Sequence, residues 1–336
     1  VQGYVKQIAL GNDTKAVKII KEKIPLPASI GRVCPHPCED KCRRALVEQP
    51  LSIAYLKAFA ADNDMKSENP FKPEVAAATG KKVAIIGGGP AGLTAAYQLA
   101  VKGHAVTVMD MMPEMGGMLR YGIPEYRLPK AVLAAEVKQI EDLGVVMCNN
   151  VKVGKDVTLE SLRESYDAVL VAVGAWKSTG VGCEGDKLEG VLGGIDLLRE
   201  VNLGGRPDLG KNVAVVGGGN VAMDACRTAV RLGAENVYVI YRRTRAEAPA
   251  EDLEITEALE EGVEFKWLTN PAEIIGENGK VTQIKLQVME LGEPDASGRR
   301  SPVPVEGKFE ILDVDTVISA IGQRCNLAGF EGLTQT

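Results

Sequence analysis

The sequence predicts an α/β fold in which one strand–loop–helix unit occurs twice. The apolar run Lys82–Ile86 leads directly into Gly87-Gly-Gly-Pro-Ala-Gly92, and a helical stretch continues from there to Gly103. About 130 residues later, Asn212–Val216 leads in the same way into Gly217-Gly-Gly-Asn-Val-Ala222. Buried strands that alternate with helices and glycine-rich turns are typical of parallel, doubly wound sheets. We therefore expect two domains of this type in one chain.

The composition limits the class of protein. The chain has 336 residues, of which 45% are hydrophobic, and this is enough to build the cores of two or three domains. Only 4% of residues are aromatic, which suits glycine-rich turns better than an aromatic binding surface. The net charge of −6 argues against a nucleic-acid-binding surface, and no apolar run is long enough to span a membrane. We expect a cytoplasmic protein that neither binds nucleic acid nor inserts into a membrane.

The N-terminal residues predict helices around a turn-rich centre. Lys15–Lys23 is charged and amphipathic, and Ser52–Ala61 has apolar residues at helical spacing. Between them, Pro25–Pro37 is rich in proline, so we expect it to interrupt the helices. Lys66–Gly80 carries the prolines and the terminal glycine of a linker.

The remaining elements alternate as an α/β fold requires. Helices are expected from Ala91 to about Lys102 and from the second glycine loop to about Leu232. Further strands are expected at Ala105–Met109, Ala168–Val173, Val237–Ile240, Val281–Val288, Phe309–Leu312 and Thr316–Ile321. Met115–Pro129 is too rich in glycine and proline for either element, so we expect a loop that could pass close to a flat ring system.

The first glycine loop has the spacing of a dinucleotide-binding site. Gly87, Gly89 and Gly92 form G-x-G-x-x-G between a strand and a helix, where the helix N-terminus faces a pyrophosphate. Asp110 ends the second strand, 21 residues after Gly89, where a carboxylate can accept hydrogen bonds from a ribose. The alternative is a tight turn beside a solvated aspartate.

The second glycine loop differs at the corresponding strand end. Gly217 and Gly219 are followed by Ala222 in the packing position, which is a tolerated variant. Arg242 and Arg243 stand where the first unit has its carboxylate, and guanidinium groups bind the 2′-phosphate of NADP. The alternative is a basic, solvated loop. The ordered pair of sites fits FAD first and NADPH second.

Three of the seven cysteines are clustered. Cys34, Cys38 and Cys42 lie within nine residues, and an odd total with one cluster does not indicate a disulfide framework. Thiolates at this spacing can converge on an iron–sulfur cluster, and Pro35 and Pro37 favour a folded loop over a helix. A zinc site with His36 and three unrelated thiols are the alternatives. The other four cysteines are expected to be buried small hydrophobes.

These motifs resemble one family in their order. Val83-Ala-Ile-Ile-Gly-Gly-Gly-Pro-Ala-Gly92, Gly116-Gly-Met-Leu-Arg-Tyr-Gly-Ile-Pro-Glu-Tyr-Arg-Leu-Pro129, Gly217-Gly-Gly-Asn-Val-Ala-Met-Asp224 and Tyr241-Arg-Arg-Thr-Arg245 are similar to motifs of the NADPH-dependent glutamate synthase small (beta) subunit family. That family includes the NADPH-binding subunit of electron-bifurcating ferredoxin–NADP transhydrogenases. Gly31–Arg44 resembles the second half of the family's [4Fe–4S] motif.

The resemblance implies two Rossmann-like dinucleotide-binding domains preceded by a small helical iron–sulfur domain, with the NADPH domain inserted in the FAD domain. The implied boundaries are 1–66 for the iron–sulfur domain, 67–80 for a linker, 81–174 for the first part of the FAD domain, 175–312 for the NADPH domain and 313–336 for the second part of the FAD domain.

The resemblance also implies which residues contact each cofactor. For FAD they are Gly87, Gly89, Pro90, Ala91, Gly92, Asp110, Gly117, Leu119, Arg127 and Val153, with Gly174 at the crossing into the inserted domain. For NADPH they are Gly217, Gly219, Asn220, Val221, Arg242 and Arg243, with Gly322 at the return crossing beside the nicotinamide and the flavin. For the [4Fe–4S] cluster they are Cys34, Cys38 and Cys42.

The chain departs from the family pattern at three places. The family's first cysteine group precedes this segment, and its C-terminal Gly-Asp motif is absent, so we expect an excerpt of a longer polypeptide. Lys57 stands where members with two clusters place a ligand, and a protonated amine cannot ligate iron.

The resemblance implies an FAD-dependent NADPH oxidoreductase module. Hydride would pass between NADPH and FAD. Single electrons would then pass from the flavin to [4Fe–4S] clusters and a partner subunit or fused domain, or in the reverse direction. That partner would be a glutamate synthase large subunit, or ferredoxin- or NADH-linked subunits. No catalytic acid or base is expected, because hydride transfer depends on placement. The alternatives are a non-catalytic scaffold with decayed nucleotide sites and a thioredoxin-reductase-type disulfide reductase, which needs a Cys-x-x-Cys that Cys226 does not provide.

Overall fold

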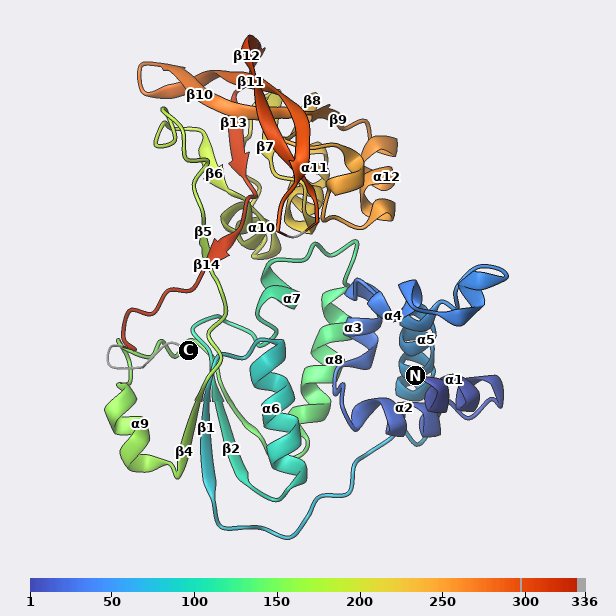
Figure 1. The fold of residues 1–336 in the computed structure, drawn as a ribbon. Coiled ribbons are helices and arrows are strands. Elements are labelled where there is room, and N and C mark those ends of the chain that lie inside the picture. The colour runs from blue at the N-terminus through green and yellow to red at the C-terminus, as the bar shows by residue number, and fades with distance from the viewer. Residues whose placement is uncertain (297, 331–336) are drawn as a thin grey trace. The chain divides into compact units, whose positions relative to one another are not determined.

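The computed structural model describes residues 1–296 and 298–330, and its chain forms two compact units (Figure 1). The first unit contains Val1–Gly174 together with the described residues from Leu327 onward, and the second contains Ala175–Asn326. The expected return at residue 313 is therefore wrong. Residues 313–326 stay with the second unit because Thr316–Ser319, strand β13, is paired on both sides within its sheet.

The first unit begins with a group of helices. They are α1 (Gln2–Ala9), α2 (Asp13–Lys21), α3 (Pro27–Val33), α4 (Pro37–Asp40), the 3₁₀ turn η1 (Arg43–Leu46) and α5 (Ile53–Lys66). A small core of α1, α2, α3 and α5 side chains, including Tyr4, Val17, Ala28 and Ile53, holds them together. Helix α3 corrects the expectation that Pro25–Pro37 is only a break. Pro27 is at its first position, where the missing N–H costs no hydrogen bond.

The linker that follows has no regular element, as expected. It leads into a parallel sheet with the order β3-β2-β1-β4, which is the order of a doubly wound nucleotide-binding unit. Its elements are β1 (Lys82–Ile86), α6 (Pro90–Val101), β2 (Ala105–Met109), α7 (Met118–Tyr121), α8 (Lys130–Glu141), β3 (Val146–Cys148), α9 (Leu159–Ser165) and β4 (Ala168–Val171). Two expectations were wrong in detail: Met115–Pro129 contains the single turn α7, and β4 ends two residues early.

Alternate residues of this sheet enter two cores. Ile85 and Val108 pack with α6 and α8 on one face, whereas Ile86 and Met109 pack with α9 on the other. Phe330 joins the second of these cores, so the chain returns to the first unit at its C-terminal end.

The second unit contains a five-stranded parallel sheet with the order β6-β13-β7-β8-β9. Its elements are β5 (Lys177–Ser178), β6 (Val191–Gly193), α10 (Gly194–Asn202), β7 (Asn212–Val216), α11 (Asn220–Leu232), β8 (Asn236–Tyr241), η2 (Arg245–Glu247), α12 (Asp252–Glu260), β9 (Glu264–Trp267), β13 (Thr316–Ser319) and β14 (Gln323–Arg324). The expected strand Thr316–Ile321 is two residues shorter, because Ile321 and Gly322 turn away toward β14.

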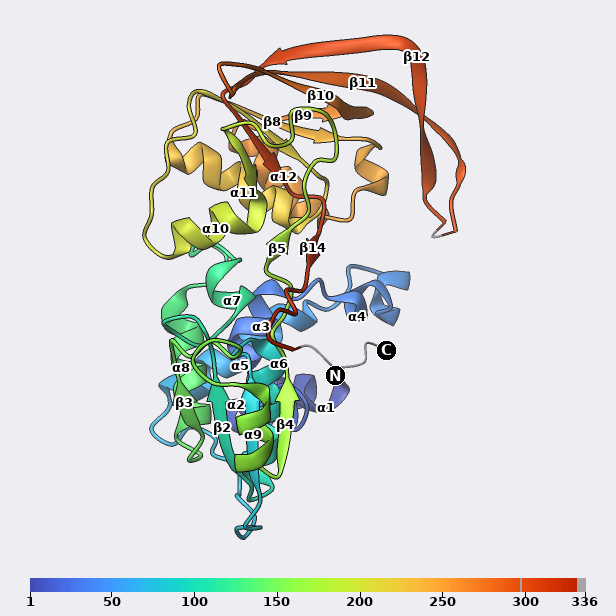
Figure 2. The ribbon, with the colours of Figure 1, turned by 90° about the vertical axis from the view of Figure 1, so that its left-hand side faces the viewer.

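Three long strands form a separate antiparallel sheet. They are β10 (Thr269–Glu277), β11 (Lys280–Pro294) and β12 (Arg300–Asp313), in that spatial order. This sheet covers the face of the parallel sheet opposite α10 and α11, which gives the second unit three layers (Figure 2).

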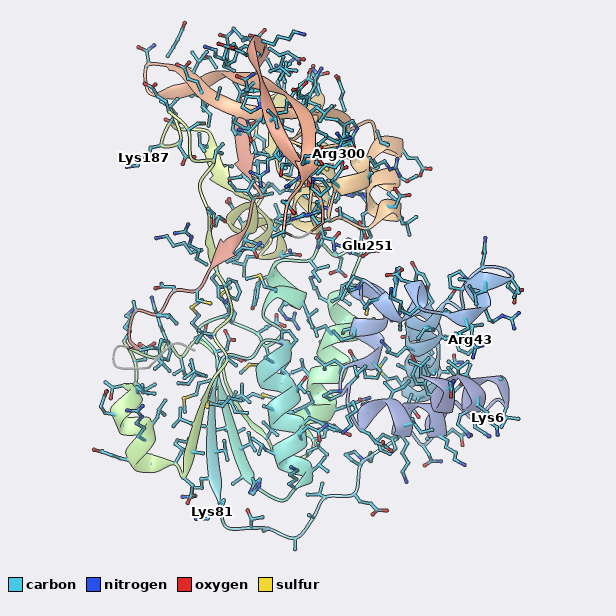
Figure 3. All side chains as sticks on the ribbon, in the orientation of Figure 1. Lys6, Arg43, Lys81, Lys187, Glu251 and Arg300 are labelled. Atoms are coloured by element: carbon cyan, nitrogen blue, oxygen red, sulfur yellow. The ribbon has the colours of Figure 1, made fainter. Side chains whose placement is uncertain are left out.

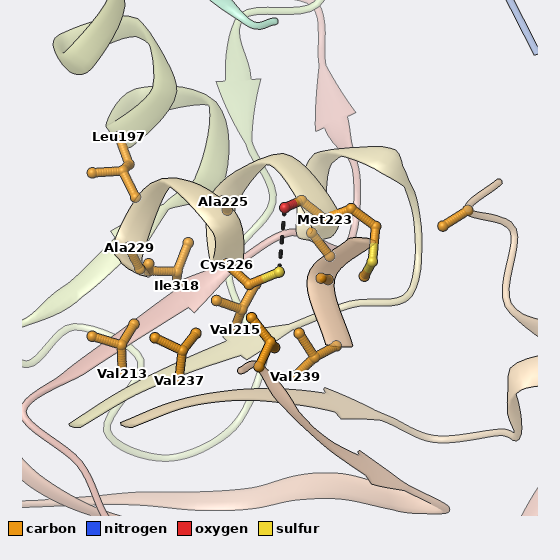
Figure 4. Close-up of a cluster of buried hydrophobic side chains, with 14 of the residues drawn as sticks. Leu197, Val213, Val215, Met223, Ala225, Cys226, Ala229, Val237, Val239 and Ile318 are labelled. Atoms are coloured by element: carbon orange, nitrogen blue, oxygen red, sulfur yellow. Dashed lines mark hydrogen bonds between the residues drawn. The ribbon is translucent and has the colours of Figure 1, made fainter. Parts of the chain in front are cut away.

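The alternation of side chains along β7 and β8 explains these layers. Val213, Val215, Val237 and Val239 face the helices and pack around Cys226 (Figure 4). Ala214, Val216 and Ile240 face the antiparallel sheet. A strand with apolar residues on both faces can be covered on both faces, and this is the pattern of a central parallel strand.

The two segments that lead into and out of the second unit pair with each other. Strands β5 and β14 form a two-stranded antiparallel ladder with Gln323 opposite Ser178. Among the residues that the structure describes, no helix is both long and apolar enough to cross a membrane.

Candidate functional site

The first glycine loop connects β1 to α6 in the first unit. Gly87 has φ +108°, and a Cβ there would overlap the carbonyl oxygen of Ala172. A Cβ at Gly92 would overlap the carbonyl oxygen of Gly87. These two glycines are therefore required by the turn and by the packing of the helix, whatever the loop binds.

Gly89 is different, because the protein itself leaves room for a side chain there. A Cβ at Gly89 would meet only the Cα of Gly117, at 3.7 Å, and its backbone has ordinary angles. Helix α6 begins at the next residue and has no side-chain cap, so its first N–H groups remain available. A bare backbone beside an uncapped helix N-terminus is a suitable site for a phosphate.

Asp110 follows β2 and is part of the loop's own structure. Its Oδ2 accepts a hydrogen bond from the Gly88 N–H at 2.6 Å, and its Oδ1 accepts one from the Met112 N–H at 2.8 Å. The side chain is buried, and this burial raises the pKa of the carboxyl against the lowering effect of the two N–H groups. Each carboxylate oxygen has a second lone pair, so Asp110 can hold the loop and still accept from a ribose.

The segment from Met115 onward contributes unequally to the first site. Gly116 N–H donates to the Gly88 carbonyl at 2.8 Å, and Gly117, with φ +54°, lies against Gly89. Leu119 and Val153, in contrast, are buried in the two cores of the sheet. The structure thus brings Gly117 to the glycine loop and uses Leu119 and Val153 for packing.

Arg127 and Gly174 lie elsewhere in the first unit. The Arg127 N–H donates to the Pro124 carbonyl at 3.1 Å, which places this residue in the turn before α8. Gly174, with φ +68°, is the last residue before the chain enters the second unit.

The second glycine loop, between β7 and α11, repeats the geometry of the first. Gly217 has φ +145°, and a Cβ there would lie 2.5 Å from the Ala320 carbonyl oxygen. A Cβ at Gly219 would meet only Pro249 Cγ, at 3.8 Å, and α11 has no side-chain cap. Asn220 Oδ1 accepts from the Glu251 N–H at 3.1 Å and joins the loop to the start of α12.

A cavity of about 650 Å³ opens over this loop, entirely within the second unit. It is lined by Gly217–Val221, by Arg242 and Arg243 after β8, and by Ala320–Gln323 after β13. Gly322 and Val221, both expected from the sequence, therefore meet here. The volume is in the range of small-molecule and cofactor sites.

The arginines of Tyr241–Arg245 differ in burial and in partners, although Arg242 and Arg243 both line the cavity. Arg242 is exposed in the cavity lining. Arg243 is buried, with its Nη2 2.8 Å from Asp295 Oδ2 and its Nε donating to the Arg300 carbonyl at 2.7 Å. Arg245 bonds Asp252 and Thr256 near α12 and does not line the cavity.

Sequence reasoning missed Arg299. It lines the cavity from the turn between β11 and β12, although it is 57 residues from Arg242 in sequence (299 − 242). The only local signal is its basic neighbour Arg300, and nothing in the strand pattern indicates where such a hairpin tip would lie.

The three clustered cysteines lie in the segment between α3 and η1, with Cys38 exposed and Cys34 and Cys42 partly buried. Cys34 follows α3, Cys38 is within α4, and Cys42 precedes η1. All three thiols are free, but the described residues contain no group of three His, Cys, Asp or Glu side chains placed to hold a metal ion. His36 Nδ1 lies 3.8 Å from Glu39 Oε2, which is too far for a hydrogen bond.

The surroundings of these thiols suit soft-metal ligation. Backbone N–H groups of Leu51, Arg44 and Ala45, with the Arg44 charge, lower the pKa of the Cys42 thiol, and N–H donors of this kind stabilise thiolate ligands. Burial, followed by the nearby Cys38 and Cys34, raises the pKa of Tyr4 to about 12, which indicates that both thiols lie near one phenol. The donor set therefore fits an iron–sulfur cluster in its chemistry.

The comparisons with known proteins follow this division of the chain. Residues 81–335 match the model of pyridine nucleotide-disulphide oxidoreductases. The chain belongs to this family. Residues 1–69 match the model described as dihydropyrimidine dehydrogenase domain II, 4Fe-4S cluster. The first match indicates FAD and NADP as cofactors, and the second indicates a 4Fe–4S cluster in the N-terminal domain.

Individual relatives of this oxidoreductase also resemble it over nearly its whole length. The chain is 37% identical to the glutamate synthase [NADPH] small chain of Escherichia coli, over 96% of its own length and 72% of that protein. It is 45% identical to the NADP(+)-dependent formate dehydrogenase subunit beta of Moorella thermoacetica, over 99% of its own length. The chain spans only 50% of that subunit. The resemblance to the glutamate synthase small subunit family is confirmed.

A solved structure agrees in fold. FprA of Mycobacterium tuberculosis in complex with NADPH has a TM-score of 0.63 and 25% identity, and the match covers 73% of this chain and 71% of that one. The α/β fold class with two nucleotide-binding units is confirmed.

The environment of Cys226 argues against the thioredoxin-reductase-type alternative. It lies in α11 with no exposed surface, donates to the Met223 carbonyl, and has its pKa raised by burial to about 12 (Figure 4). A buried, protonated thiol is not a redox nucleophile.

Proposed function

We propose that the chain is the NADPH-oxidising, FAD-binding module of a larger electron-transfer enzyme. One observation carries this proposal: Gly89 and Gly219 are glycines that the fold does not need, each beside an uncapped helix N-terminus. Gly87 and Gly217 are explained by the conformation of the turn. Gly89 and Gly219 are not, so the close approach of a ligand to the backbone is the remaining reason for a glycine there.

The residues that follow β2 and β8 indicate which nucleotide each unit would bind. Asp110, held by two N–H groups, suits a ribose with free hydroxyls and would repel a 2′-phosphate. The second site has the exposed Arg242 at the same point, and a guanidinium binds a phosphate with charge-assisted hydrogen bonds. FAD is therefore assigned to the first unit and NADPH to the second.

The chain's own residues act by binding and placement. Bound FAD would supply the hydride acceptor for NADPH and a one-electron outlet toward a [4Fe–4S] cluster. Gly89 leaves the backbone of the first loop open to a pyrophosphate, and Gly219 does the same in the second loop. Asn220 holds the second loop against the start of α12 through the Glu251 N–H. No side chain is required to move a proton in this scheme.

Cys34, Cys38 and Cys42 are proposed as ligands of the cluster. The family match of residues 1–69 and the lowered pKa of the Cys42 thiol support this assignment. The partner that exchanges single electrons is a further subunit or fused domain, as in glutamate synthase or in ferredoxin- or NADH-linked complexes. A cytoplasmic location is part of the proposal, since a reducing compartment keeps thiols available as ligands.

The two alternatives are less well supported. A disulfide reductase needs a reactive dithiol, and Cys226 is buried and protonated. A non-catalytic scaffold has no need of Gly89 or Gly219, because the fold tolerates a methyl group at both.

The test is an anaerobic titration of the FAD-reconstituted full chain with NADPH or NADH, followed by flavin absorbance. We expect stoichiometric flavin reduction by NADPH and much weaker reduction by NADH. Gly219→Val should block reduction by NADPH while dithionite still reduces the bound flavin, which separates nucleotide binding from flavin loss. A chain that binds no FAD, or whose FAD is unaffected by NADPH, would refute the proposal.

A further inference from the structure

The hairpin of β11 and β12 extends beyond the sheet to which it belongs. β10 pairs with β11 as far as Val288, and the Met289 N–H donates to the Leu268 carbonyl, so the part from Glu290 to Val303 is a two-stranded arm (Figure 2). The pairing register shifts between Gln287 and Met289 and again between Leu291 and Pro294, so the ladder of the arm is interrupted twice. The second shift has one extra residue on β11, as in a bulge, and a bulge bends a ribbon. A two-stranded ribbon is only marginally stable alone, so its position depends on other contacts.

Arg243 provides such contacts from the end of β8. Its Nη2 pairs with Asp295 Oδ2 at 2.8 Å on one side of the tip, and its Nε donates to the Arg300 carbonyl at 2.7 Å on the other. Figure 3 labels Arg300 where β12 begins. Arg243 is only 5% exposed. The side chain predicted to bind a phosphate is thus committed to the arm, with its charge balanced by a carboxylate.

The turn at the tip is closed by its own backbone. Asp295 N–H donates to the Arg299 carbonyl at 2.7 Å, and Gly298 N–H donates to the Asp295 carbonyl at 2.9 Å. Asp295 therefore links Arg243 to the backbone of Arg299. The Arg300 guanidinium is used within the arm, where it bonds the carbonyls of Gly292 and Leu291.

This arrangement delivers a second exposed arginine to the cavity. Arg299 and Arg242 both line it and both are exposed, whereas Arg245 is turned to α12. We propose that Arg299 and Arg242 are the pair that binds the 2′-phosphate of NADPH, and that Arg243 is a positioning residue that fixes the arm through Asp295. This inference rests on the proposed NADPH site and assigns its specificity residues.

The chemistry favours two exposed guanidinium groups from separate elements. Each can donate two parallel hydrogen bonds to a phosphate, and two cations from separate elements can contact a dianion from two sides. The arm makes the preference for NADPH depend on a residue far from the glycine loop.

The test measures binding of two probes to the full chain by calorimetry, without FAD or a cluster. Adenosine 2′,5′-bisphosphate carries the phosphate in question, and adenosine 5′-monophosphate lacks it. Wild-type protein should prefer the bisphosphate, and Arg299→Ala should weaken its binding about tenfold while leaving the monophosphate unchanged. Arg245→Ala is the matched control from the same sequence motif and should change neither.

Asp295→Asn separates a positioning role for Arg243 from direct binding. If Arg243 positions the arm, this variant weakens bisphosphate binding and adds little to Arg243→Ala in the double variant. If Arg243 bound the phosphate itself, removing its carboxylate partner would strengthen binding, and that result would overturn the inference. So would an Arg299→Ala variant that binds the bisphosphate normally. Equal wild-type affinity for both probes would instead refute the proposed NADPH site.

Discussion

Replacing Arg227 with alanine should destabilise the second unit, because this one guanidinium joins α11 to α12. Its Nη1 lies 2.6 Å from Glu257 Oε2 and 3.1 Å from Glu254 Oε2, and its Nη2 lies 2.8 Å from Glu261 Oε1. The Arg227 side chain is 7% exposed. The alanine variant would leave three carboxylates close together without their common cation.

The magnitude follows from this burial. Removing one partner of a buried ion pair costs about 3–5 kcal/mol, and partial exposure of the carboxylates (13%, 39% and 23%) places the effect near the lower end. We expect a loss of about 3 kcal/mol, or about 6–12 °C in Tm for a unit of roughly 150 residues. Arg231→Ala is the matched control: it bonds Glu261 as well, but it is 43% exposed and should cost less than about 1 kcal/mol.

The assay can address the second unit alone. The chain has two tryptophans, Trp176 and Trp267, and both belong to that unit, so tryptophan fluorescence during urea unfolding reports on it. An Arg227→Ala midpoint indistinguishable from that of Arg231→Ala would refute the reasoning.

The same ion pairs predict how the stability difference between wild type and Arg227→Ala depends on pH. Hydrogen bonds from Arg231 and then Arg227 lower the pKa of Glu261 from its usual 4.5 to about 2. A carboxyl whose folded pKa is depressed contributes stability above its unfolded pKa and loses it as the pH falls toward the folded value. The difference between wild type and Arg227→Ala should therefore shrink between about pH 5 and pH 2.

Three further predictions concern the first unit. Gly89→Ala should fold normally but lose FAD on gel filtration, and full retention of FAD would contradict the assignment of FAD to this loop. Gly87→Ala is the contrasting variant and should fail to fold, because φ is +108° at this position. Glu136 accepts from two buried N–H groups at the start of α3, at 2.7 and 2.9 Å, so Glu136→Ala should cost at least about 2 kcal/mol in urea unfolding followed by circular dichroism. A loss below about 0.5 kcal/mol would show that the donors find other partners. Cys38→Ser should lower the iron content and stop electron delivery while NADPH still reduces FAD, and unchanged iron would exclude this ligand.

Several features could be predicted because they depend on neighbours in sequence. The strands Lys82–Ile86, Ala105–Met109 and Asn212–Val216 were predicted at their observed bounds, because apolar runs between glycine turns have few other conformations. The contrast between Asp110 and Arg242 also follows from local spacing.

Short helices inside proline- and glycine-rich segments could not be predicted in this way. α3 begins at Pro27, and the N–H groups that such a start leaves unpaired are satisfied by Glu136, 108 residues away. That partner is invisible to any local pattern.

The sequence by itself determined the two nucleotide loops, their order and the family, since glycine spacing and strand periodicity are local properties of the chain. Only the tertiary structure decided that residues 313–326 remain in the second unit, that Arg243 is buried against Asp295, and that Arg299 reaches the cavity. The physical reason is that burial and ion pairing depend on which distant segments pack together. The identity of an arginine fixes its charge, but the contacts around it decide whether that charge faces a ligand or another side chain.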